Sequence, residues 1–322
     1  MPLTQHLARD LRASDFEFVV TGANGWLGRA TLHALHDALG SEFLHRVTAL
    51  GSRHSCIDAV PGQSLPVHTM LDWRPVGLRP LMVFHYAFLT KDTVAGMSQE
   101  EYTARNDAIA SQVRQWICSG RVAKMMLPSS GAVYDHLQPS GRDPAAGLYG
   151  RLKWQDEEMF SEICERQRCG LVIARVFNLA GPYINKFNSY ALASFIVQTL
   201  QHRRITINAT RPVIRSYYLV TDLLELCLRL FLAQPSSYTE RFDTAGYETV
   251  ELSALAQRIL RSVGADEAQV VRPPQISSIP PDNYVGNSQR IRELERSLSI
   301  NPAPLDQQID ATRLFITNAL RA

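Results

Sequence analysis

Three residues of this 322-residue chain, Ser130, Tyr149 and Lys153, have the types and spacing to move a proton. Tyr149 and Lys153 stand four residues apart in a segment expected to be helical, so both side chains lie on one helix face. A neighbouring ammonium lowers the pKa of a tyrosine from its usual value of about 10. The Ser130 hydroxyl is suited to hold a substrate oxygen while Tyr149 exchanges a proton with it. The set predicts oxidoreductase chemistry; an exposed helical Tyr–Lys pair is the alternative.

A phosphate-binding loop is indicated near the N-terminus by the segment Thr21-Gly22-Ala23-Asn24-Gly25-Trp26-Leu27-Gly28. The segment joins an expected strand, Phe16 to Thr21, to an expected helix, Trp26 to Leu39, as a dinucleotide-binding loop requires. Glycine permits a tight turn and close approach of a pyrophosphate, and a helix N-terminus favours an anion. A tight turn without a ligand is the alternative. The residues predicted to bind the cofactor here are Gly22, Asn24, Gly25, Trp26, Leu27 and Gly28.

The end of the next expected strand, Val47 to Leu50, bears on which dinucleotide is bound. An acidic residue at that place accepts a hydrogen bond from the adenosine ribose 2′-hydroxyl and selects NAD(H). The chain continues instead as Gly51-Ser52-Arg53, without a carboxylate. Arg53 is able to pair with a 2′-phosphate by charge-assisted hydrogen bonds, so we expect Ser52 and Arg53 to contact NADP(H). NAD(H) and a solvated Arg53 are the alternatives.

The elements that must position these residues alternate between strand and helix. Such alternation predicts an α/β fold with a Rossmann-type, doubly wound parallel sheet. Further strands are expected at Met82 to Tyr86, Ala123 to Leu127 and Leu171 to Phe177, and helices from about Ser98 to Cys118 and from Tyr149 to Cys169.

After about Pro182 short strands and proline-rich loops separate the helices. These helices are expected near Tyr190 to His202, Asp222 to Phe231, Leu252 to Val263 and Leu305 to Leu320. We expect residues 1–182 to form an NAD(P)-binding Rossmann domain that receives strand and helix returns from the C-terminal half. Residues 183–322 are expected to form a smaller mixed α/β lobe that binds substrate at the carboxyl edge of the sheet.

The glycine-rich loop, the segment Ser129-Ser130-Gly131-Ala132-Val133-Tyr134 and the Tyr149–Lys153 pair together resemble the extended short-chain dehydrogenase/reductase family. More closely they resemble its nucleotide-sugar epimerase, dehydratase and reductase branch, from about Phe16 to the C-terminal helix. The resemblance implies that His85 and Ala87 border the cofactor and that Asn106 completes a catalytic tetrad. It also implies a homodimer formed through the helices that carry Asn106 and Lys153.

Two segments of the C-terminal half carry the resemblance further. Arg175 to Pro182 resembles the family's "RxFNxxGP", which implies that Asn178 contacts the sugar nucleotide. Arg215 to Asp222 resembles "RDYIHVxD", which implies that Arg215 grips the diphosphate, with Tyr284 as a further substrate contact. The alternatives are that Asn178 satisfies loop backbone and that Arg215 is a surface charge.

The chain departs from the family pattern at several positions. Gly51 replaces the ribose-binding Asp of NAD-using epimerases, Phe88 stands where a small alanine is usual beside the cofactor, and no arginine precedes Tyr284. Gly131-Ala132 replaces the Asp-Glu pair of hexose 4,6-dehydratases. We therefore expect NADP(H)-dependent reduction of a 4-keto nucleotide sugar. The alternatives are an NAD-dependent nucleotide-sugar 4-epimerase and a catalytically silent dinucleotide-binding regulatory protein.

The composition is that of an ordinary globular chain, 45% hydrophobic and 20% charged with a formal net charge of +2. No basic run suggests nucleic acid or a membrane surface as a partner. The N-terminal segment MPLTQHLARDLRASD lacks the apolar core of a signal peptide. Five cysteines at irregular spacings match no zinc site. Free thiols in a reducing cytoplasm and no bound metal are therefore expected.

Overall fold

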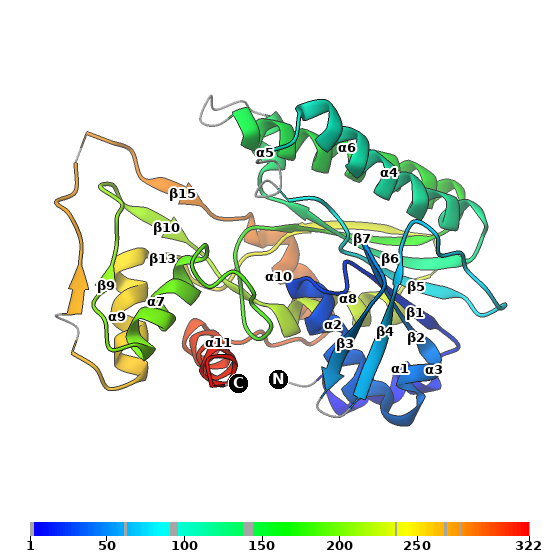
Figure 1. Ribbon diagram of the computed structural model, residues 1–322, viewed down its shortest axis with the longest axis horizontal. Helices are drawn as coiled ribbons and strands as arrows, with labels where there is room; N and C mark the ends of the chain where they lie inside the picture. The colour runs from blue at the N-terminus through cyan, green and yellow to red at the C-terminus, as the bar shows by residue number, and fades with distance from the viewer. Residues whose placement is uncertain are drawn as a thin grey trace. The chain divides into compact units, whose positions relative to one another are not determined.

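The computed structural model describes residues 3–60, 63–90, 96–137, 144–235, 237–266, 269–276 and 278–321, and these residues form two compact units. The larger unit contains the described residues up to 176 and those of 224–242. The smaller unit contains residues 177–223 and the described residues from 243 onwards. Figure 1 shows the elements of both units, coloured along the chain.

An eight-stranded sheet forms the centre of the larger unit, in the order β12-β7-β6-β5-β1-β2-β4-β3. The neighbouring pairs from β7 to β4 are parallel, and β3 returns antiparallel to β4 at one edge. All five predicted strands are present, whereas β3, β4 and β12 are additional. The strands are β1 (Glu17–Thr21), β2 (Val47–Gly51), β3 (Ser55–Val60), β4 (Gln63–Thr69), β5 (Leu81–His85), β6 (Val122–Ser130), β7 (Gly170–Val176) and β12 (Thr239–Asp243).

Helices cover both faces of this sheet (Figure 1). On one face α4 (Gln99–Cys118) and α6 (Pro144–Arg166) lie side by side, and α1 (Gln5–Ala13), α2 (Trp26–Leu39) and α3 (Phe43–Arg46) lie on the other. Successive side chains at the end of β5 point to opposite faces of the sheet. His85 contacts Phe160 of α6, whereas Tyr86, just beyond the strand, hydrogen-bonds Thr31 of α2. The short helices η1 (Gly40–Glu42) and α5 (Val133–Leu137) complete the connections.

The bounds of α6 correct the prediction for this helix. It begins at Pro144 rather than at Tyr149, so Tyr149 lies in its second turn. Proline is favoured in the first turn of a helix, where its missing N–H is not needed. The helix ends at Arg166 rather than at Cys169, because Arg168 adopts a left-handed conformation with φ of 55°.

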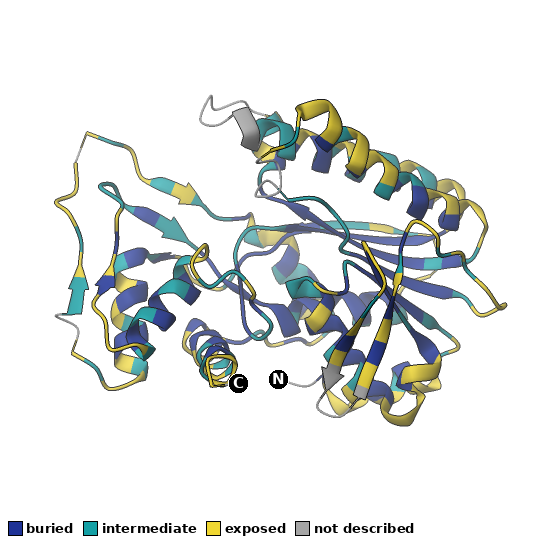
Figure 2. Ribbon diagram, in the orientation of Figure 1, coloured by how far each residue is buried: buried dark blue, intermediate teal, exposed yellow. Residues whose placement is uncertain are grey.

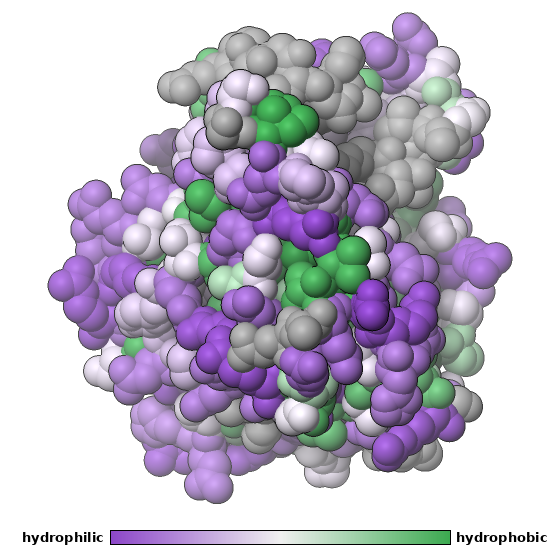
Figure 3. Space-filling model, turned by 90° about the vertical axis from the view of Figure 1, so that its left-hand side faces the viewer, coloured by the Kyte–Doolittle hydropathy of each residue, from purple (hydrophilic) through white to green (hydrophobic). Residues whose placement is uncertain are grey.

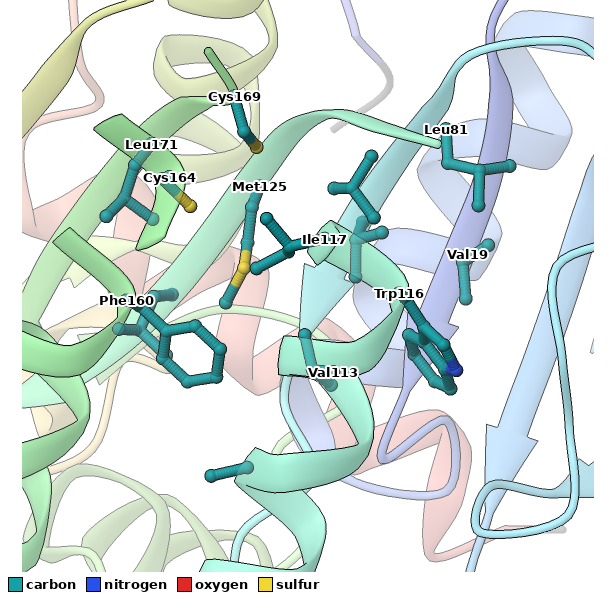
Figure 4. Close-up of a cluster of buried hydrophobic side chains, with 14 of the residues drawn as sticks. Val19, Leu81, Val113, Trp116, Ile117, Met125, Phe160, Cys164, Cys169 and Leu171 are labelled. Carbon is teal, nitrogen blue, oxygen red and sulfur yellow. The ribbon is translucent and has the colours of Figure 1, made fainter. Parts of the chain in front are cut away.

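A hydrophobic core lies between the sheet and the α4–α6 pair (Figure 4). Trp116 and Phe160, among the largest buried side chains, reach it from α4 and α6. Burying an apolar side chain of this size contributes about 1.5 to 3 kcal/mol. The strands are buried, and the outward faces of α4 and α6 are exposed (Figure 2). The core therefore fixes α6, which carries Tyr149 and Lys153, against the sheet.

The smaller unit is built around β10 (Val213–Arg215), which pairs antiparallel with β13 (Val250–Glu251) and parallel with β15 (Asp282–Tyr284). The described residues contain all four helices predicted for the C-terminal half, whereas α10 was not predicted. The face seen in Figure 3 is mostly hydrophilic, with separate hydrophobic groups. The other elements are β8 (Leu179–Ala180), α7 (Ala191–Leu200), β9 (Ile205–Thr206), β11 (Tyr218–Leu219), α8 (Val220–Ala233), α9 (Leu252–Ser262), β14 (Val270–Val271), α10 (Ser288–Ser297) and α11 (Leu305–Ala319).

The predicted fold class, a Rossmann-type α/β fold, is confirmed by this architecture. Helix α8 begins in the smaller unit, and its residues from Leu224 onwards belong to the larger unit. All five cysteines are free thiols. None of the helices in the described part of the chain has the length and apolarity needed to cross a bilayer.

Candidate active site

The glycine-rich loop between β1 and α2 has no room for side chains at two of its glycines. Gly22 has φ of 62°, and a Cβ there would stand 2.8 Å from the Ala87 nitrogen. A Cβ at Gly28 would overlap the Gly22 carbonyl oxygen. Gly25 is the N-cap residue of α2. Because the backbone turns this tightly at a helix N-terminus, the loop fits the pyrophosphate of a dinucleotide. The remaining predicted residues of the loop, Asn24, Trp26 and Leu27, are exposed or partly exposed.

The end of β2 lies against this loop, since the Ala23 nitrogen donates to the Leu50 carbonyl over 3.1 Å. A Cβ at Gly51 would stand 2.9 Å from Val67 Cγ1, so a side chain there would require Val67 of β4 to shift. Ser52 and Arg53, which follow, are both exposed. The position predicted to choose between the dinucleotides therefore has no carboxylate, and a guanidinium lies two residues beyond it.

His85 ties the end of β5 to the end of β1. The Thr21 hydroxyl accepts from the Ala87 nitrogen over 3.0 Å and lies 3.0 Å from His85 Nδ1, so its own hydrogen is available to that ring nitrogen. Burial, together with the charge of Lys153, lowers the pKa of His85 to about 3. The imidazole is therefore neutral, and its contact with Thr21 joins the end of β5 to the end of β1.

Lys153 is buried, and its ammonium has two specific contacts. Nζ donates to the Pro128 carbonyl over 3.1 Å and lies 3.7 Å from the centre of the Phe88 ring. Burial lowers the pKa of Lys153 to about 8, and the charges of Asp156 and Glu157 oppose the shift. At neutral pH the ammonium form therefore still predominates.

Ser130 and Tyr149 come from different elements that pack closely. Ser130 ends β6, and its Oγ accepts from the Ala132 nitrogen over 3.2 Å. A Cβ at Gly150 would overlap the Ala132 carbonyl oxygen, so this glycine lets the second turn of α6 approach the Ser130 segment. The Tyr149 ring meets the Phe88 ring edge to face at 5.7 Å. The structure thus brings the three predicted residues to the carboxyl end of β6.

Asn106 is buried and hydrogen-bonds backbone on two sides. Its amide oxygen accepts from the Leu89 nitrogen over 2.8 Å, and its amide nitrogen donates to the Tyr102 carbonyl over 3.2 Å. The Tyr102 hydroxyl in turn donates to the Leu89 carbonyl over 2.7 Å. In this structure Asn106 therefore fixes the backbone after β5, next to Phe88, and its tetrad role stays a prediction.

A buried ion cluster joins α6 to the central sheet. Glu157, fully buried, accepts from Arg175 Nε over 2.9 Å and from Nη2 over 2.8 Å, and Arg241 Nε lies 3.2 Å from it. Tyr149, Lys153 and Glu157 are spaced by four residues, so they share one helix face. The cluster ties that face to β7 and β12. Glu157 and Gly150 were not predicted, although the four-residue spacing and the glycine beside Tyr149 are visible in the sequence.

The three predicted substrate residues lie together in the smaller unit. Asn178 Nδ2 donates to the carbonyls of Ser216 over 3.3 Å and Tyr284 over 3.2 Å, so its amide fixes loop backbone. Arg215 pairs with the Asp282 carboxylate over 2.9 Å, and its guanidinium lies 5.9 Å from the centre of the Tyr284 ring. An anion that binds Arg215 therefore meets the negative charge of Asp282 beside it, and Asp282 was not predicted from the sequence.

A doubly wound sheet with this loop and this Ser, Tyr and Lys arrangement is the hallmark of short-chain dehydrogenase/reductase enzymes. The model of the NAD dependent epimerase/dehydratase family matches residues 18–241, and the chain belongs to that family. The predicted family resemblance and the assignment as an enzyme are therefore confirmed.

Individual relatives are more distant. Over 137 residues the chain is 25% identical to UDP-glucuronic acid decarboxylase 1 of Xenopus tropicalis, a match that covers 42% of this chain and 32% of that protein. The chain thus matches about a third of the length of this curated relative.

Two solved structures show the same fold over nearly the whole chain. One is a UDP-N-acetylglucosamine 4-epimerase from Methanobrevibacter ruminantium in complex with UDP-N-acetylmuramic acid, with a TM-score of 0.72, 17% identity, and coverage of 95% of this chain and 99% of that chain. The other is a UDP-glucuronic acid 4-epimerase from Bacillus cereus in complex with UDP-glucuronic acid and NAD, with a TM-score of 0.69, 17% identity, and coverage of 94% and 99%.

Proposed function

We propose that this enzyme reduces the carbonyl of a 4-keto nucleotide sugar with NADPH. The observation that carries the proposal is the buried Lys153 ammonium on the helix face of Tyr149, at the end of the strand that carries Ser130. A buried cation beside a phenol has a direct chemical use, because it stabilises the phenolate that remains after proton transfer. The glycine-rich loop fits a dinucleotide, which when bound supplies the hydride for the carbonyl carbon.

The side chains have distinct roles in this reaction. The Ser130 hydroxyl donates to the carbonyl oxygen and orients it. Tyr149 donates its proton to the same oxygen, so the carbonyl becomes an alcohol and a phenolate remains. The Lys153 ammonium stabilises that phenolate, and its remaining hydrogen-bonding capacity is available to the nicotinamide ribose. His85 is neutral and leaves the proton transfer to Tyr149.

The preference for NADPH is supported by the end of β2. Gly51 cannot be replaced by an acidic residue without moving Val67, and the exposed Arg53 is suited to a 2′-phosphate. The test is to titrate NADPH and NADH into the wild type, into Arg53→Ala and into Arg203→Ala, an exposed arginine outside the proposed interface that serves as the matched control. We expect Arg53→Ala to weaken NADPH binding by roughly tenfold and NADH binding little. If NADH binds the wild type as tightly as NADPH, the cofactor assignment is wrong.

An NAD-dependent nucleotide-sugar 4-epimerase is the second candidate, favoured by the description of the family and by the names of its structural neighbours. The same Ser130, Tyr149 and Lys153 would remove a hydride to the cofactor and direct its return. An epimerase interconverts two 4-hydroxy nucleotide sugars without net change in the absorbance of the reduced cofactor. A reductase consumes NADPH with a 4-keto sugar, so one panel of both substrate types separates the two functions.

We propose binding roles for the two parts of the chain and an oligomeric state as well. Residues 1–182 would bind the cofactor, and residues 183–322 would bind the nucleotide sugar through Asn178, Arg215 and Tyr284. We further propose a cytoplasmic homodimer that forms through the exposed faces of α4 and α6 (Figure 2). Light scattering after size-exclusion chromatography would give the mass of a dimer for the wild type, and a monomer mass would overturn this part.

A further inference from the structure

Phe88 contacts both Lys153 and Tyr149, the two residues that the proposed reaction needs most. Lys153 Nζ lies 3.7 Å from its ring centre, which is van der Waals contact with the ring face. Tyr149 meets the same ring edge to face at 5.7 Å. One aromatic side chain therefore covers the ammonium and contacts the ring of the phenol, all within the larger unit.

The contacts of Lys153 leave little space for a further ligand on the Phe88 side. One N–H of the ammonium is directed to the Pro128 carbonyl. The face of an aromatic ring carries negative quadrupole charge and attracts a desolvated cation. Any group that binds Nζ from the Phe88 side must therefore displace the ring first.

The backbone on both sides of Phe88 is held in place. The Ala87 nitrogen donates to Thr21 Oγ1, the Leu89 nitrogen donates to Asn106 Oδ1, and the Leu89 carbonyl accepts from the Tyr102 hydroxyl. A ring that leaves Lys153 therefore moves by rotation of its own side-chain torsions. The movement is local and does not require the segment to detach from β1 or α4.

We propose that Phe88 is a positioning residue that covers the Lys153 ammonium and the Tyr149 ring, and that the ribose of an entering dinucleotide displaces it. The proposal rests on the proposed function, since it takes a dinucleotide as the ligand of Lys153. Phe88 keeps water away from the pair before binding, and its displacement exposes the ammonium only when cofactor occupies the site. Phe88 departs from the family pattern, and the sequence alone assigns it no role.

Cofactor affinity provides the first test. NADPH and NADH are titrated into the wild type, Phe88→Ala and Phe88→Leu, and thermal unfolding is recorded for each. Because the cation–ring contact no longer has to be broken, we expect Phe88→Ala to bind its preferred dinucleotide about five- to tenfold more tightly. Phe88→Leu keeps bulk without the quadrupole and is expected to show a smaller gain; it replaces Phe88→Ala if that variant does not fold. A role in packing alone predicts weaker binding in both variants.

The position of the ring provides the second test. The chain has four lysines, Lys91, Lys124, Lys153 and Lys186, so ¹³Cε-lysine labelling gives four NMR signals, and Lys153→Met assigns the relevant one. Ring current from Phe88 should shift the Lys153 signal upfield, and saturating NADPH should remove that shift. Lys124, whose Nζ lies 5.0 Å from the centre of the Tyr238 ring, is the internal control and should not change.

The outcomes separate this proposal from the proposed function. A wild type that binds dinucleotide while the Lys153 signal stays upfield, or while neither Phe88 variant binds more tightly, overturns the role of Phe88 alone. A wild type without binding whose Phe88→Ala variant does bind supports that role. If neither protein binds NADPH or NADH, both the proposed function and the role of Phe88 fail.

Discussion

Burying the charged ammonium of a single residue, Lys153, raises the free energy of the folded protein. The surroundings of Lys153 show which contacts offset this cost. The Pro128 carbonyl accepts a hydrogen bond from it, the Phe88 ring faces it, and Asp156 and Glu157 lie close enough to favour the charged form. Burial still outweighs these effects, because the pKa of Lys153 falls to about 8. The ammonium form still predominates at neutral pH, as the role proposed for Lys153 requires.

Replacing Tyr149 by Phe tests the proposed proton donor. The change removes one oxygen and keeps the ring, so packing against Phe88 and the fold should be retained. Turnover should fall by about 10² to 10⁴-fold, the usual worth of a general acid–base group. The measurement is NADPH consumption with a panel of 4-keto nucleotide sugars, together with NADPH titration to show that cofactor binding survives. Near-wild-type turnover on any accepted substrate contradicts the mechanism.

The titration of Lys153 predicts a pH dependence of stability. Lys153 has a pKa of about 8 in the folded protein and 10.5 as its reference value, so between these values the unfolded chain binds more protons than the folded one. The free energy of unfolding therefore receives a contribution from this residue that rises with pH through that window. Lys153→Met should lack the rise, whereas Arg151→Met, an exposed change on the same helix, should keep it. Urea unfolding at several pH values gives the comparison, and identical slopes in all three proteins would contradict the assignment.

Helix α6 is the element that assembles the site. Tyr149, Lys153 and Glu157 lie along one of its faces, and Glu157 is fastened by Arg175 of β7 and Arg241 of β12. Removing one partner of such a buried ion pair typically costs about 3 to 5 kcal/mol. The cluster makes the position of α6 on the sheet costly to change, and the position of the Tyr149 and Lys153 side chains follows from it.

Two glycines of α6 provide a matched pair for a test of this packing. A Cβ at Gly150 would overlap the Ala132 carbonyl oxygen, whereas a Cβ at Gly147 meets no atom within 4 Å. Gly150→Ala should move the helix away from Ser130, lower stability by roughly 1 to 3 kcal/mol and reduce turnover. Gly147→Ala should gain up to about 1 kcal/mol, because alanine favours the helical backbone. Thermal unfolding and NADPH consumption measure both effects; equal behaviour of the two variants would show that the Ala132 contact is unimportant.

Elements with long periodic patterns could be predicted from the sequence, and those whose burial depends on neighbours could not. Helix α2 has the predicted bounds, because its apolar residues repeat over fourteen positions. Helix α10 buries Ile291, Leu294 and Glu295 in an otherwise charged segment, too few apolar residues for a clear period. The spacing of Tyr149 and Lys153 is local and readable. The contact of Phe88 with Lys153, the pairing of Arg215 with Asp282 and the hydrogen bonds of Asn106 join distant residues and depend on the folded chain.

The whole molecule divides the proposed binding roles between two units. The larger unit holds the glycine-rich loop, Ser130, Tyr149 and Lys153, and the smaller unit holds Asn178, Arg215 and Tyr284. The chain passes between the units after residues 176, 223 and 242. A ligand that binds only the folded form of one unit stabilises that unit, by about 2.7 kcal/mol at one hundred times its Kd.

Hydrogen exchange should therefore assign each ligand to its unit. NADPH is expected to slow exchange around residues 22–28 and 128–133, and UDP or dTDP is expected to slow it around residues 213–215 and 282–284. Arg215→Ala should abolish the second effect and leave the first unchanged, because its guanidinium is the proposed diphosphate contact. The exposed Arg203→Ala, also in the smaller unit, is the matched control and should keep both effects. Nucleotide protection that survives in Arg215→Ala removes this arginine from the substrate site, and NADPH protection confined to the smaller unit would reverse the assignment of the two units.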